Sequence, residues 1–214
     1  FNDVPADYWA SGYINIASSN GIINGYGDGN FGPDDLVLYE DAIKMVVAAL
    51  GYNPEAETKG GYPGGYMTIA AREGILNNVK NGSMGQGANR GMVAQMVFNS
   101  LEVPIMDQVG YGTSVTFEQT SDVLLDKLDV DKVEGVVTKV PGSTDSRLPS
   151  YKVVYHVQKQ YEVSGNKRVL RSANYTINAD VGDTNAKDML EQYTYAYIKD
   201  LDDDPLMIAI IEKS

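Results

Sequence analysis

The chain contains no cysteine and only one histidine among its 214 residues. Without cysteine there is no disulfide framework and no thiol chemistry, and a single histidine excludes His/Cys metal clusters and Cys–His dyads. Basic residues are also scarce, since 17 Lys and Arg oppose 29 Asp and Glu, for a net charge of −12 and a pI near 4.4. This charge argues against nucleic-acid binding, which needs a basic face. No apolar run reaches the length of a membrane span, so no membrane insertion is expected.

Few residues are arranged for catalysis. His156 lies in an expected strand between Tyr155 and Val157, and we interpret it as a strand-face residue rather than a base or metal ligand. Acidic pairs such as Asp34–Asp35 fall in turns or at helix starts, where solvation and capping explain them. We therefore expect no enzymatic activity, no metal site and no cofactor.

Glycine, by contrast, is concentrated in one stretch, residues 21–33, which read G-I-I-N-G-Y-G-D-G-N-F-G-P. Such density favours backbone torsions that other residues resist and lets the backbone approach a neighbour closely. A helical pattern precedes the stretch, with Trp9, Tyr13, Ile16 and Ala17 on one face, and Gly21 is expected to end this helix.

A second helix is expected over Tyr39–Leu50, with Gly51 as its stop. Its predicted buried stripe comprises Ala42, Ile43, Val46, Ala49 and Leu50.

This helix–loop–helix unit occurs twice. A shift of 53 residues pairs Trp9 with Tyr62 and Gly21 with Gly74, and beyond the loop a shift of 51 pairs Met45 with Met96. The second loop, 79–88, is two residues shorter than the first, 26–37. A unit this small cannot bury its own apolar face, so the copies must pack together.

The second half of the chain changes character. Five segments rich in Val, Ile, Tyr and Thr are predicted strands: 133–140, 151–161, 168–177, 193–199 and 206–212. Turn signals lie at 141–143, 164–166 and 202–205, and a short helical turn is expected near 186–190. A further short helix is expected within 121–128, capped by Thr120 or Ser121.

We therefore predict an α+β chain. The predicted domains are helical repeats at 1–108 (1–52 and 60–105), a linker with a short helix at 109–130, and a small antiparallel β-barrel or sandwich at 131–214. The segment 103–111 looks like the exit from the repeats.

The first repeat resembles the S-layer homology (SLH) module. The matching residues are F-N-D-V at 1–4, W-A-S-G-Y-I at 9–14, the stretch at 17–33, and A-A-L-G-Y at 48–52. The second repeat resembles a diverged copy, with G-G-Y-P-G-G-Y at 60–66, A-A-R-E-G-I-L at 70–76 and N-R-G-M-V-A-Q at 89–95. The resemblance implies a bacterial, extracellular, non-catalytic module. Such modules usually come in threes, form a pseudo-threefold bundle and bind secondary cell-wall polysaccharide, often pyruvylated.

The chain departs from the family where the second helix begins. The family usually has Thr-Arg-Ala-Glu there, a capping box with an exposed Arg that can meet an anionic sugar. The first repeat has Leu38-Tyr39-Glu40-Asp41, and the second has Asn89-Arg90-Gly91-Met92. Two modules also leave a threefold bundle incomplete. A third module outside this piece, the segment 115–128, or association of two chains could complete it.

The candidate glycan-binding residues follow from this resemblance. Arg90 is the best candidate for bidentate contact with an anionic substituent, with Lys44 and Arg72 as auxiliary cations. Trp9 is either a stacking platform for a sugar or, as we favour, a core residue, and Tyr39 offers either a hydroxyl or packing.

The glycine loop is a further candidate. Gly27 and Asp28, with Gly25 and Gly29, either line a binding groove or pack against the next module. Residues 1–108 carry five basic and twelve acidic side chains, a net charge of −7, so binding of an anionic polymer would depend on local cations.

The leading hypothesis is non-covalent anchoring to an anionic cell-wall polysaccharide at the bacterial surface. The alternative is that degenerate repeats act as a structural scaffold or self-association module without binding glycan. The chain begins at Phe1, without an initiator Met or a signal peptide, so we expect it to be a piece of a longer exported protein.

Overall fold

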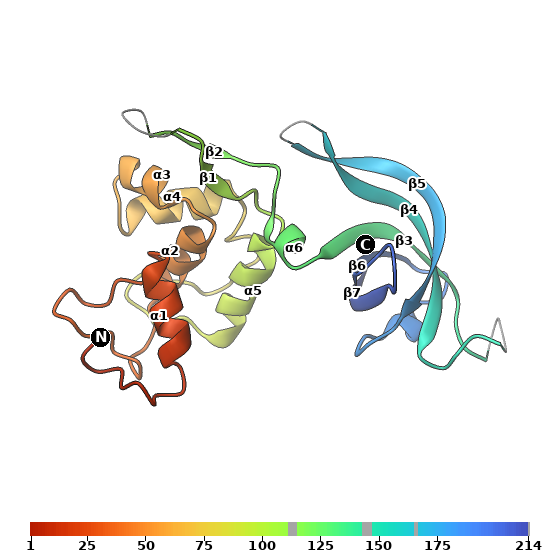
Figure 1. The fold of residues 1–214 in the computed structure, drawn as a ribbon, viewed down its shortest axis with the longest axis horizontal. Helices are drawn as coiled ribbons and strands as arrows, with labels where there is room; N and C mark the ends of the chain where they lie inside the picture. Colours follow the sequence, from red (N-terminus) through yellow and green to blue (C-terminus); the bar gives the residue numbers. More distant parts are fainter. Residues whose placement is uncertain (111–114, 143–146, 165–166, 214) are drawn as a thin grey trace. The chain divides into compact units, whose positions relative to one another are not determined.

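The computed structural model describes residues 1–110, 115–142, 147–164 and 167–213. The chain divides into two compact units, Phe1–Thr120 and Ser121–Ser214 (Figure 1). The first unit is mainly helical and the second is mainly strand, so the expected α+β class is confirmed. Within the described residues, no helix combines the length and the apolar composition needed to cross a membrane.

The two repeats are visible in the positions of the helices. The first helices are α1 (Ser11–Ser19) and α4 (Gly64–Arg72), and the second helices are α2 (Tyr39–Ala49) and α5 (Arg90–Ser100). Both ends of α4 lie 53 residues after those of α1, and both ends of α5 lie 51 residues after those of α2. These are the two shifts predicted from the sequence.

Left-handed glycines end the helices of the first repeat. Gly21 follows α1 with φ of 67°, and Gly51 follows α2 with φ of 85°, as predicted. The predicted stripe on α2 is only partly right. Ala42, Ile43 and Leu50 are buried as predicted, whereas Val46 is half-buried and Ala49 is exposed. Val47 and Ala48 are buried in their place.

The prediction for the first helix picked the wrong face. Trp9 precedes α1 and is 79% exposed, and Tyr13 and Ile16 on the helix are 73% and 62% exposed. The buried residues are Ala10 and Ile14, which form a small cluster with Ile23 of the following loop. Tyr13, Ile14 and Ile16 are all apolar and point in different directions around the helix, so periodicity did not decide which side the loop would cover. The favoured assignment of Trp9 to the core is therefore wrong.

Three elements of the first unit were not predicted. Helix α3 (Asn53–Thr58) begins with a proline near its first position, which suits a helix start. Strands β1 (Met106–Gln108) and β2 (Phe117–Gln119) form an antiparallel pair. This pair is tied to the repeats, because the Met106 backbone N–H donates to the Leu50 carbonyl (2.9 Å). The expected exit segment thus runs along the repeats, and its last residue, Tyr111, lies outside the described residues.

The second unit contains every predicted strand. Its elements are α6 (Leu124–Lys127), β3 (Val130–Lys139), β4 (Lys152–Ser164), β5 (Lys167–Asp180), η1 (Ala186–Asp188), β6 (Tyr193–Lys199) and β7 (Leu206–Glu212). The helical turn and the turn at 202–205 are present. The turns at 141–143 and 164–166 extend outside the described residues.

The predicted cap of the short helix is wrong. Val123 occupies the N-cap of α6, and its backbone N–H donates to the Asp126 carboxylate (2.9 Å). Thr120 and Ser121 both lie before this N-cap position.

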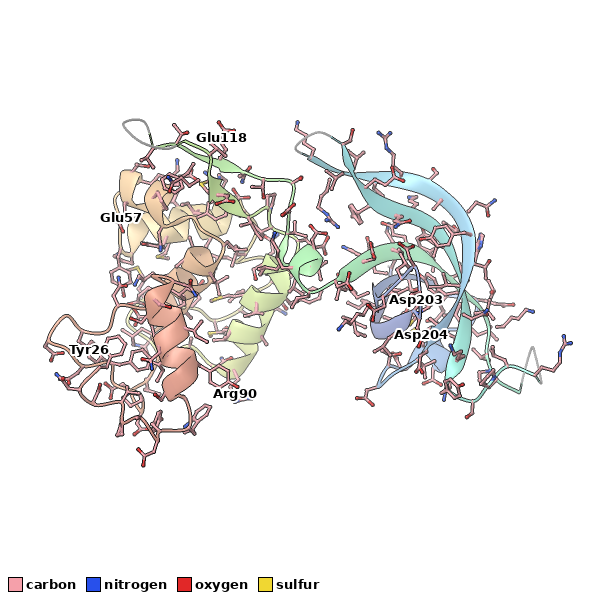
Figure 2. All side chains as sticks on the ribbon, in the orientation of Figure 1. Tyr26, Glu57, Arg90, Glu118, Asp203 and Asp204 are labelled. Atoms are coloured by element: carbon pink, nitrogen blue, oxygen red, sulfur yellow. The ribbon has the colours of Figure 1, made fainter. Side chains whose placement is uncertain are left out.

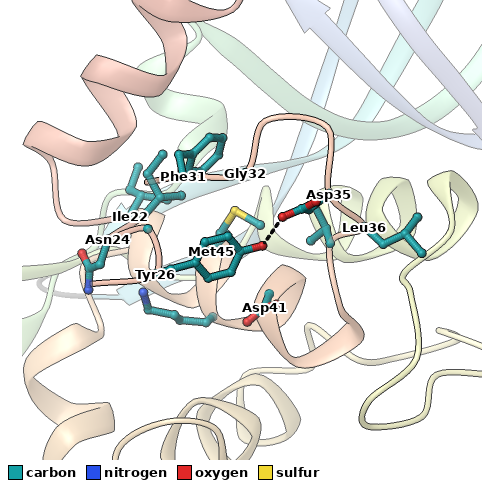
Figure 3. A pocket seen from close by; sticks show the side chains of 13 residues that line it. Ile22, Asn24, Tyr26, Phe31, Gly32, Asp35, Leu36, Asp41 and Met45 are labelled. Atoms are coloured by element: carbon teal, nitrogen blue, oxygen red, sulfur yellow. Dashed lines mark hydrogen bonds between the residues drawn. The ribbon is translucent and has the colours of Figure 1, made fainter. Parts of the chain in front are cut away.

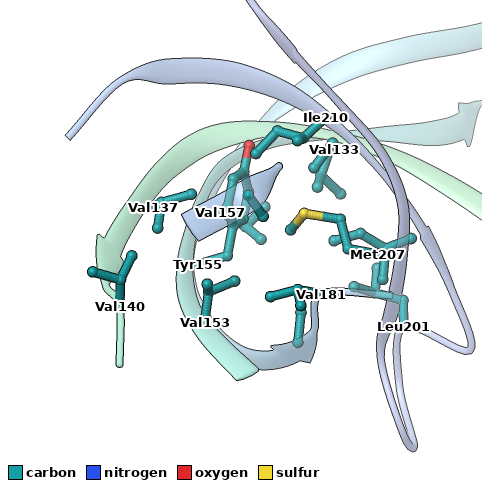
Figure 4. Close-up of a cluster of buried hydrophobic side chains, with 14 residues drawn as sticks. Val133, Val137, Val140, Val153, Tyr155, Val157, Val181, Leu201, Met207 and Ile210 are labelled. Carbon is teal, nitrogen blue, oxygen red and sulfur yellow. The ribbon is translucent and has the colours of Figure 1, made fainter. Parts of the chain in front are cut away.

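The strands pair in the order β3-β4-β5-β7-β6, and β6 returns to β3. All neighbours are antiparallel except β5 and β7, which share a single parallel pair, Asp180 with Leu206. Fourteen buried residues fill the interior (Figure 4). His156 is half-buried between the buried Tyr155 and Val157, on the face of β4 opposite theirs, as we interpreted it.

One buried carboxylate is built into β3. Glu134 is 1% exposed, and it accepts hydrogen bonds from Tyr193 Oη (3.0 Å) and Lys213 Nζ (2.8 Å). Burial alone would raise the pKa of Glu134, but the Lys213 and Tyr193 hydrogen bonds outweigh it and hold the pKa below its usual value. The folded state therefore favours the ionised form.

We predict that Glu134→Gln lowers the free energy of unfolding of the second unit by about 2 kcal/mol at neutral pH. Because the folded pKa is lowered, this stabilisation is present above the unfolded pKa of about 4.3 and disappears as the pH falls through the folded pKa. Denaturant titrations at neutral and acid pH should show the difference between wild type and variant shrinking in acid. Glu162→Gln, at an exposed position of β4, is the control. It should leave the free energy of unfolding unchanged at neutral and at acid pH.

A second prediction concerns Gly135, where β3 and β4 approach closely. A Cβ at this position would lie 2.0 Å from the His156 carbonyl oxygen, which requires the strands to move apart. Gly135→Ala should therefore destabilise the second unit by about 1–3 kcal/mol in denaturant unfolding. Gly12→Ala is the control, and it should cause no such loss. Gly12 lies in α1, and a Cβ there would meet nothing within 4 Å. Equal stability of Gly135→Ala and wild type would contradict the close approach.

Candidate functional site

A groove lies between the glycine loop and α2 of the first repeat. It is lined by loop residues within 22–26, 31–32 and 35–37, and by Asp41, Lys44 and Met45 of α2 (Figure 3). Its volume is about 180 Å³. Pockets that hold drug-sized ligands have volumes of about 300 Å³ or more, so this groove suits one small group rather than a long chain.

Glycines and one aspartate shape the tip of the loop. The Tyr26 backbone N–H donates to the Asn30 carbonyl (3.0 Å), and Asp28 Oδ1 accepts from the Asn30 backbone N–H (2.9 Å). Gly27 stands between them with φ of 82°. Neither Gly27 nor Asp28 lines the groove, and the Asp28 carboxylate is engaged within the turn.

Asp3 fixes the far side of the loop. Its carboxylate accepts hydrogen bonds from the backbone N–H groups of Phe31 (2.8 Å) and Gly32 (2.7 Å). Burial would raise the pKa of Asp3, but these donors, Gly32 first, bring it below its usual value. In the sequence, Asp3 is marked only by its place in the F-N-D-V motif. Its partners lie 28 and 29 residues away, and no local pattern indicates the contact.

The carboxylates in the groove are engaged by tyrosine hydroxyls. Tyr26 Oη donates to Asp35 Oδ2 (2.7 Å), as Figure 3 shows, and this bond, together with burial, raises the pKa of Tyr26. Tyr62 Oη donates to Asp41 Oδ1 (2.8 Å). Burial, together with the Asp41 bond, raises the pKa of Tyr62.

Lys44 is the cation of this groove. It is half-buried and forms no ion pair with any described residue. Because no ion pair engages it, the Lys44 ammonium remains able to meet an anionic group of a ligand.

The second repeat has a counterpart groove with different chemistry. Its lining includes Asn78–Asn81 from the loop and Met92 and Gln95 from α5. By the shift of 51, Met92 and Gln95 stand where the first groove has Asp41 and Lys44. The helix side of the second groove is therefore uncharged, and Lys80 of the loop supplies its cation.

Arg90 lies beside the second groove but does not line it. It is exposed at the first position of α5, and its neighbours Asn89 and Gly91 line that groove. Asn89 Oδ1 caps the helix by accepting from the Met92 backbone N–H (2.9 Å). Figure 2 shows Arg90 well separated from Tyr26 of the first groove. The structure therefore does not bring Arg90 and Lys44 into one site.

Arg72 is committed to ion pairs. Its guanidinium binds both carboxylate oxygens of Glu55 and donates from Nε to Glu73 (2.6 Å), and it lies over the Tyr52 ring. The Glu55 bond and the Glu73 bond raise the pKa of Arg72. This residue therefore crosslinks α3 and α4.

Two aromatic candidates lie outside the grooves. Tyr39 is 8% exposed, and a Cβ at residue 82 would meet its ring at 2.2 Å, so the ring packs directly on Gly82 of the second loop. Trp9 is exposed ahead of α1 and lines neither groove.

Comparison with known proteins finds three curated relatives of this chain. Over 212 residues, 97% of the chain, it is 31% identical to a middle cell wall protein of Brevibacillus brevis. It is 33% identical over 127 residues (59% of the chain) to a surface layer protein of Brevibacillus choshinensis, and 35% identical over 112 residues (51%) to a cell surface protein of Thermoanaerobacter kivui. The chain spans 20%, 11% and 14% of the length of these relatives, respectively.

No solved structure matches the chain. The family model for the S-layer homology domain matches residues 1–43, which hold α1, the glycine loop and the start of α2. These findings confirm the resemblance of the first repeat: residues 1–43 match the S-layer homology domain, and the chain is similar to cell-wall and surface-layer proteins.

Proposed function

We propose that this chain anchors a larger protein at the bacterial cell surface by non-catalytic binding of an anionic cell-wall polysaccharide. The observation that carries the proposal is Lys44, a half-buried ammonium without an ion pair among the described residues, in a groove whose carboxylates are engaged by tyrosines. The names of the relatives, a middle cell wall protein and a surface layer protein, support a location at the wall.

The overall charge does not help this binding. Residues 1–108 carry a net charge of −7, which repels an anionic polymer at long range. Salt screens that repulsion beyond roughly 8–10 Å, whereas a direct ammonium–carboxylate contact in a groove is screened less. Affinity would then depend on Lys44, with Arg90 and Lys80 as a second and separate point of contact.

The second unit enters the proposal only as a companion domain. We infer that it is a barrel rather than a two-sheet sandwich, and the cyclic strand order with one shared core supports this. Nothing in its described residues points to polysaccharide as clearly as Lys44 does.

The first test is a pull-down with isolated cell-wall sacculi, before and after acid extraction of the secondary polymer. We predict that extraction abolishes binding and that Lys44→Gln weakens it about tenfold, since a hydrogen bond to a charged group contributes about 1.5–3 kcal/mol. Lys44→Arg keeps the charge and should retain most of the affinity.

Lys187→Gln, at an exposed position of the second unit, removes the same charge outside the groove and serves as the control. Binding that is unchanged after the polymer has been extracted would contradict the polysaccharide proposal. Equal binding of Lys44→Gln and wild type would place the site elsewhere.

A separate prediction concerns the second groove. Arg90→Gln should weaken sacculus binding by about tenfold if the polymer contacts both repeats. Its effect should add to that of Lys44→Gln, because the two residues share no partner. Full affinity of Arg90→Gln would restrict the site to the first groove.

A second candidate function is self-association of the repeats. The specific observation in its favour is the pair of exposed apolar side chains on α1, Tyr13 and Ile16. The segment 115–128, which was one candidate to complete the bundle, instead contributes β2 to a pair with β1.

A further inference from the structure

Three asparagines of this chain are directly followed by glycine: Asn20, Asn24 and Asn81. In an Asn-Gly pair the asparagine side chain is open to attack by the next backbone nitrogen, because glycine has no Cβ to hinder the approach. All three asparagines are exposed, so exposure does not distinguish them. Their hydrogen bonds do distinguish them.

Asn20 is held in place at the end of α1. Its side-chain amide donates to the Ile16 carbonyl (3.0 Å). The next backbone N–H, that of Gly21, donates to the Ser18 carbonyl (3.0 Å). The fold therefore engages both groups that would have to react, and these two hydrogen bonds must break before the groups can meet.

Asn24 and Asn81 are not held in this way. Among the described residues, neither side chain forms a hydrogen bond, and the backbone N–H groups of Gly25 and Gly82 have no acceptor. Each of these asparagines also lines a groove, Asn24 the groove that contains Lys44 (Figure 3) and Asn81 the groove of the second repeat. The two Asn-Gly pairs that the described hydrogen bonds leave unengaged therefore lie at the two candidate binding grooves.

The fold requires the glycine in both of these pairs. A Cβ at Gly25 would collide with the Asn30 carbonyl oxygen, and a Cβ at Gly82 would collide with the Tyr39 ring. Gly25 also has φ of 64°, a conformation that side chains resist. Because no larger residue fits after either asparagine, the reactive pair is retained at both grooves.

We propose that Asn24 and Asn81 are sites of spontaneous deamidation, and that the reaction places a carboxylate in each groove. The glycine nitrogen loses its proton and attacks Cγ of the asparagine, and the new C–N bond closes a five-membered imide. The Cγ–Nδ2 bond breaks, and the leaving nitrogen takes up the proton and departs as ammonia. Water then opens the ring at either carbonyl and yields aspartate or isoaspartate. The reaction consumes only water, and it accelerates as the pH rises because the attacking nitrogen must lose its proton.

The consequence of this modification for binding rests on the proposed function. The first groove has a volume of about 180 Å³, so a carboxylate on residue 24 would compete with an anionic ligand group for the Lys44 ammonium. In the second groove, residue 81 directly follows Lys80, and both line the groove. Attachment to an anionic polymer would therefore weaken as the molecule ages.

The modification is tested by incubating the whole 214-residue chain in mildly alkaline buffer at physiological temperature. Tandem mass spectrometry of proteolytic peptides follows the conversion of amide to acid at each position over time. We expect Asn24 and Asn81 to convert at least about tenfold faster than Asn20, because the two hydrogen bonds at Asn20 must first be broken.

The same incubation in guanidinium chloride is the control for the effect of neighbouring sequence. Without the fold, all three asparagines should convert at similar rates. In the folded chain, rates at Asn24 and Asn81 that do not exceed the rate at Asn20 would overturn the inference. Conversion of only one of the two would remove the other as a site.

Binding to sacculi tests the consequence. Asn24→Asp carries the charge of the product and should weaken binding about tenfold, as loss of a hydrogen bond to a charged group does. Aged wild type should lose binding in step with its conversion at Asn24. Asn174→Asp, at an exposed position of β5, adds the same charge outside both grooves and is the control.

The two measurements separate the possible failures. Full binding by Asn24→Asp would contradict the effect on the first groove. A wild type that never binds sacculi would contradict the anchoring proposal alone, since the mass spectra decide the modification without any ligand.

Discussion

The packing of α2 against α4 is the contact on which the helical unit depends. A single helix–loop–helix of this size has an apolar face and no partner for it, so the fold exists only where one repeat covers another. Ile43, Val47 and Ile69 are all fully buried in the first unit. Outside this contact, apolar side chains of the outer helices are exposed, such as Tyr13 and Ile16 on α1 and Phe98 on α5.

The glycine loop depends on a different interaction. Its positive-φ glycines make the turn possible, but the Asp3 carboxylate, which binds the Phe31 and Gly32 amides, holds the turn in place. Loop and α2 together form the groove, and tyrosine hydroxyls occupy its carboxylates. Lys44 lines the same groove and forms no ion pair with any described residue.

Much of the fold could be predicted from the sequence because it depends on local patterns. Alternation located all five long strands, and the predicted shifts of 53 and 51 match the spacing of the two pairs of helices. The errors were made where tertiary contact decides. Tyr13 and Ile16 looked like a core stripe, but the loop covers Ile14 instead. The sequence indicated Lys44 and Arg90 as cations. It did not indicate that Glu55 and Glu73 neutralise Arg72, because Glu55 lies 17 residues away.

The two candidate functions use different parts of each repeat. The grooves are formed by loop residues and by polar positions of the second helix, including Asp41 and Lys44. The uncovered faces are formed by Tyr13 and Ile16 on α1 and by Ala94 on α5. Substitutions on one set leave the other set intact, so a repeat that loses glycan contacts can keep its packing faces. The departures at Leu38–Tyr39 and Gly91–Met92 alter the start of the second helix without removing either apolar face.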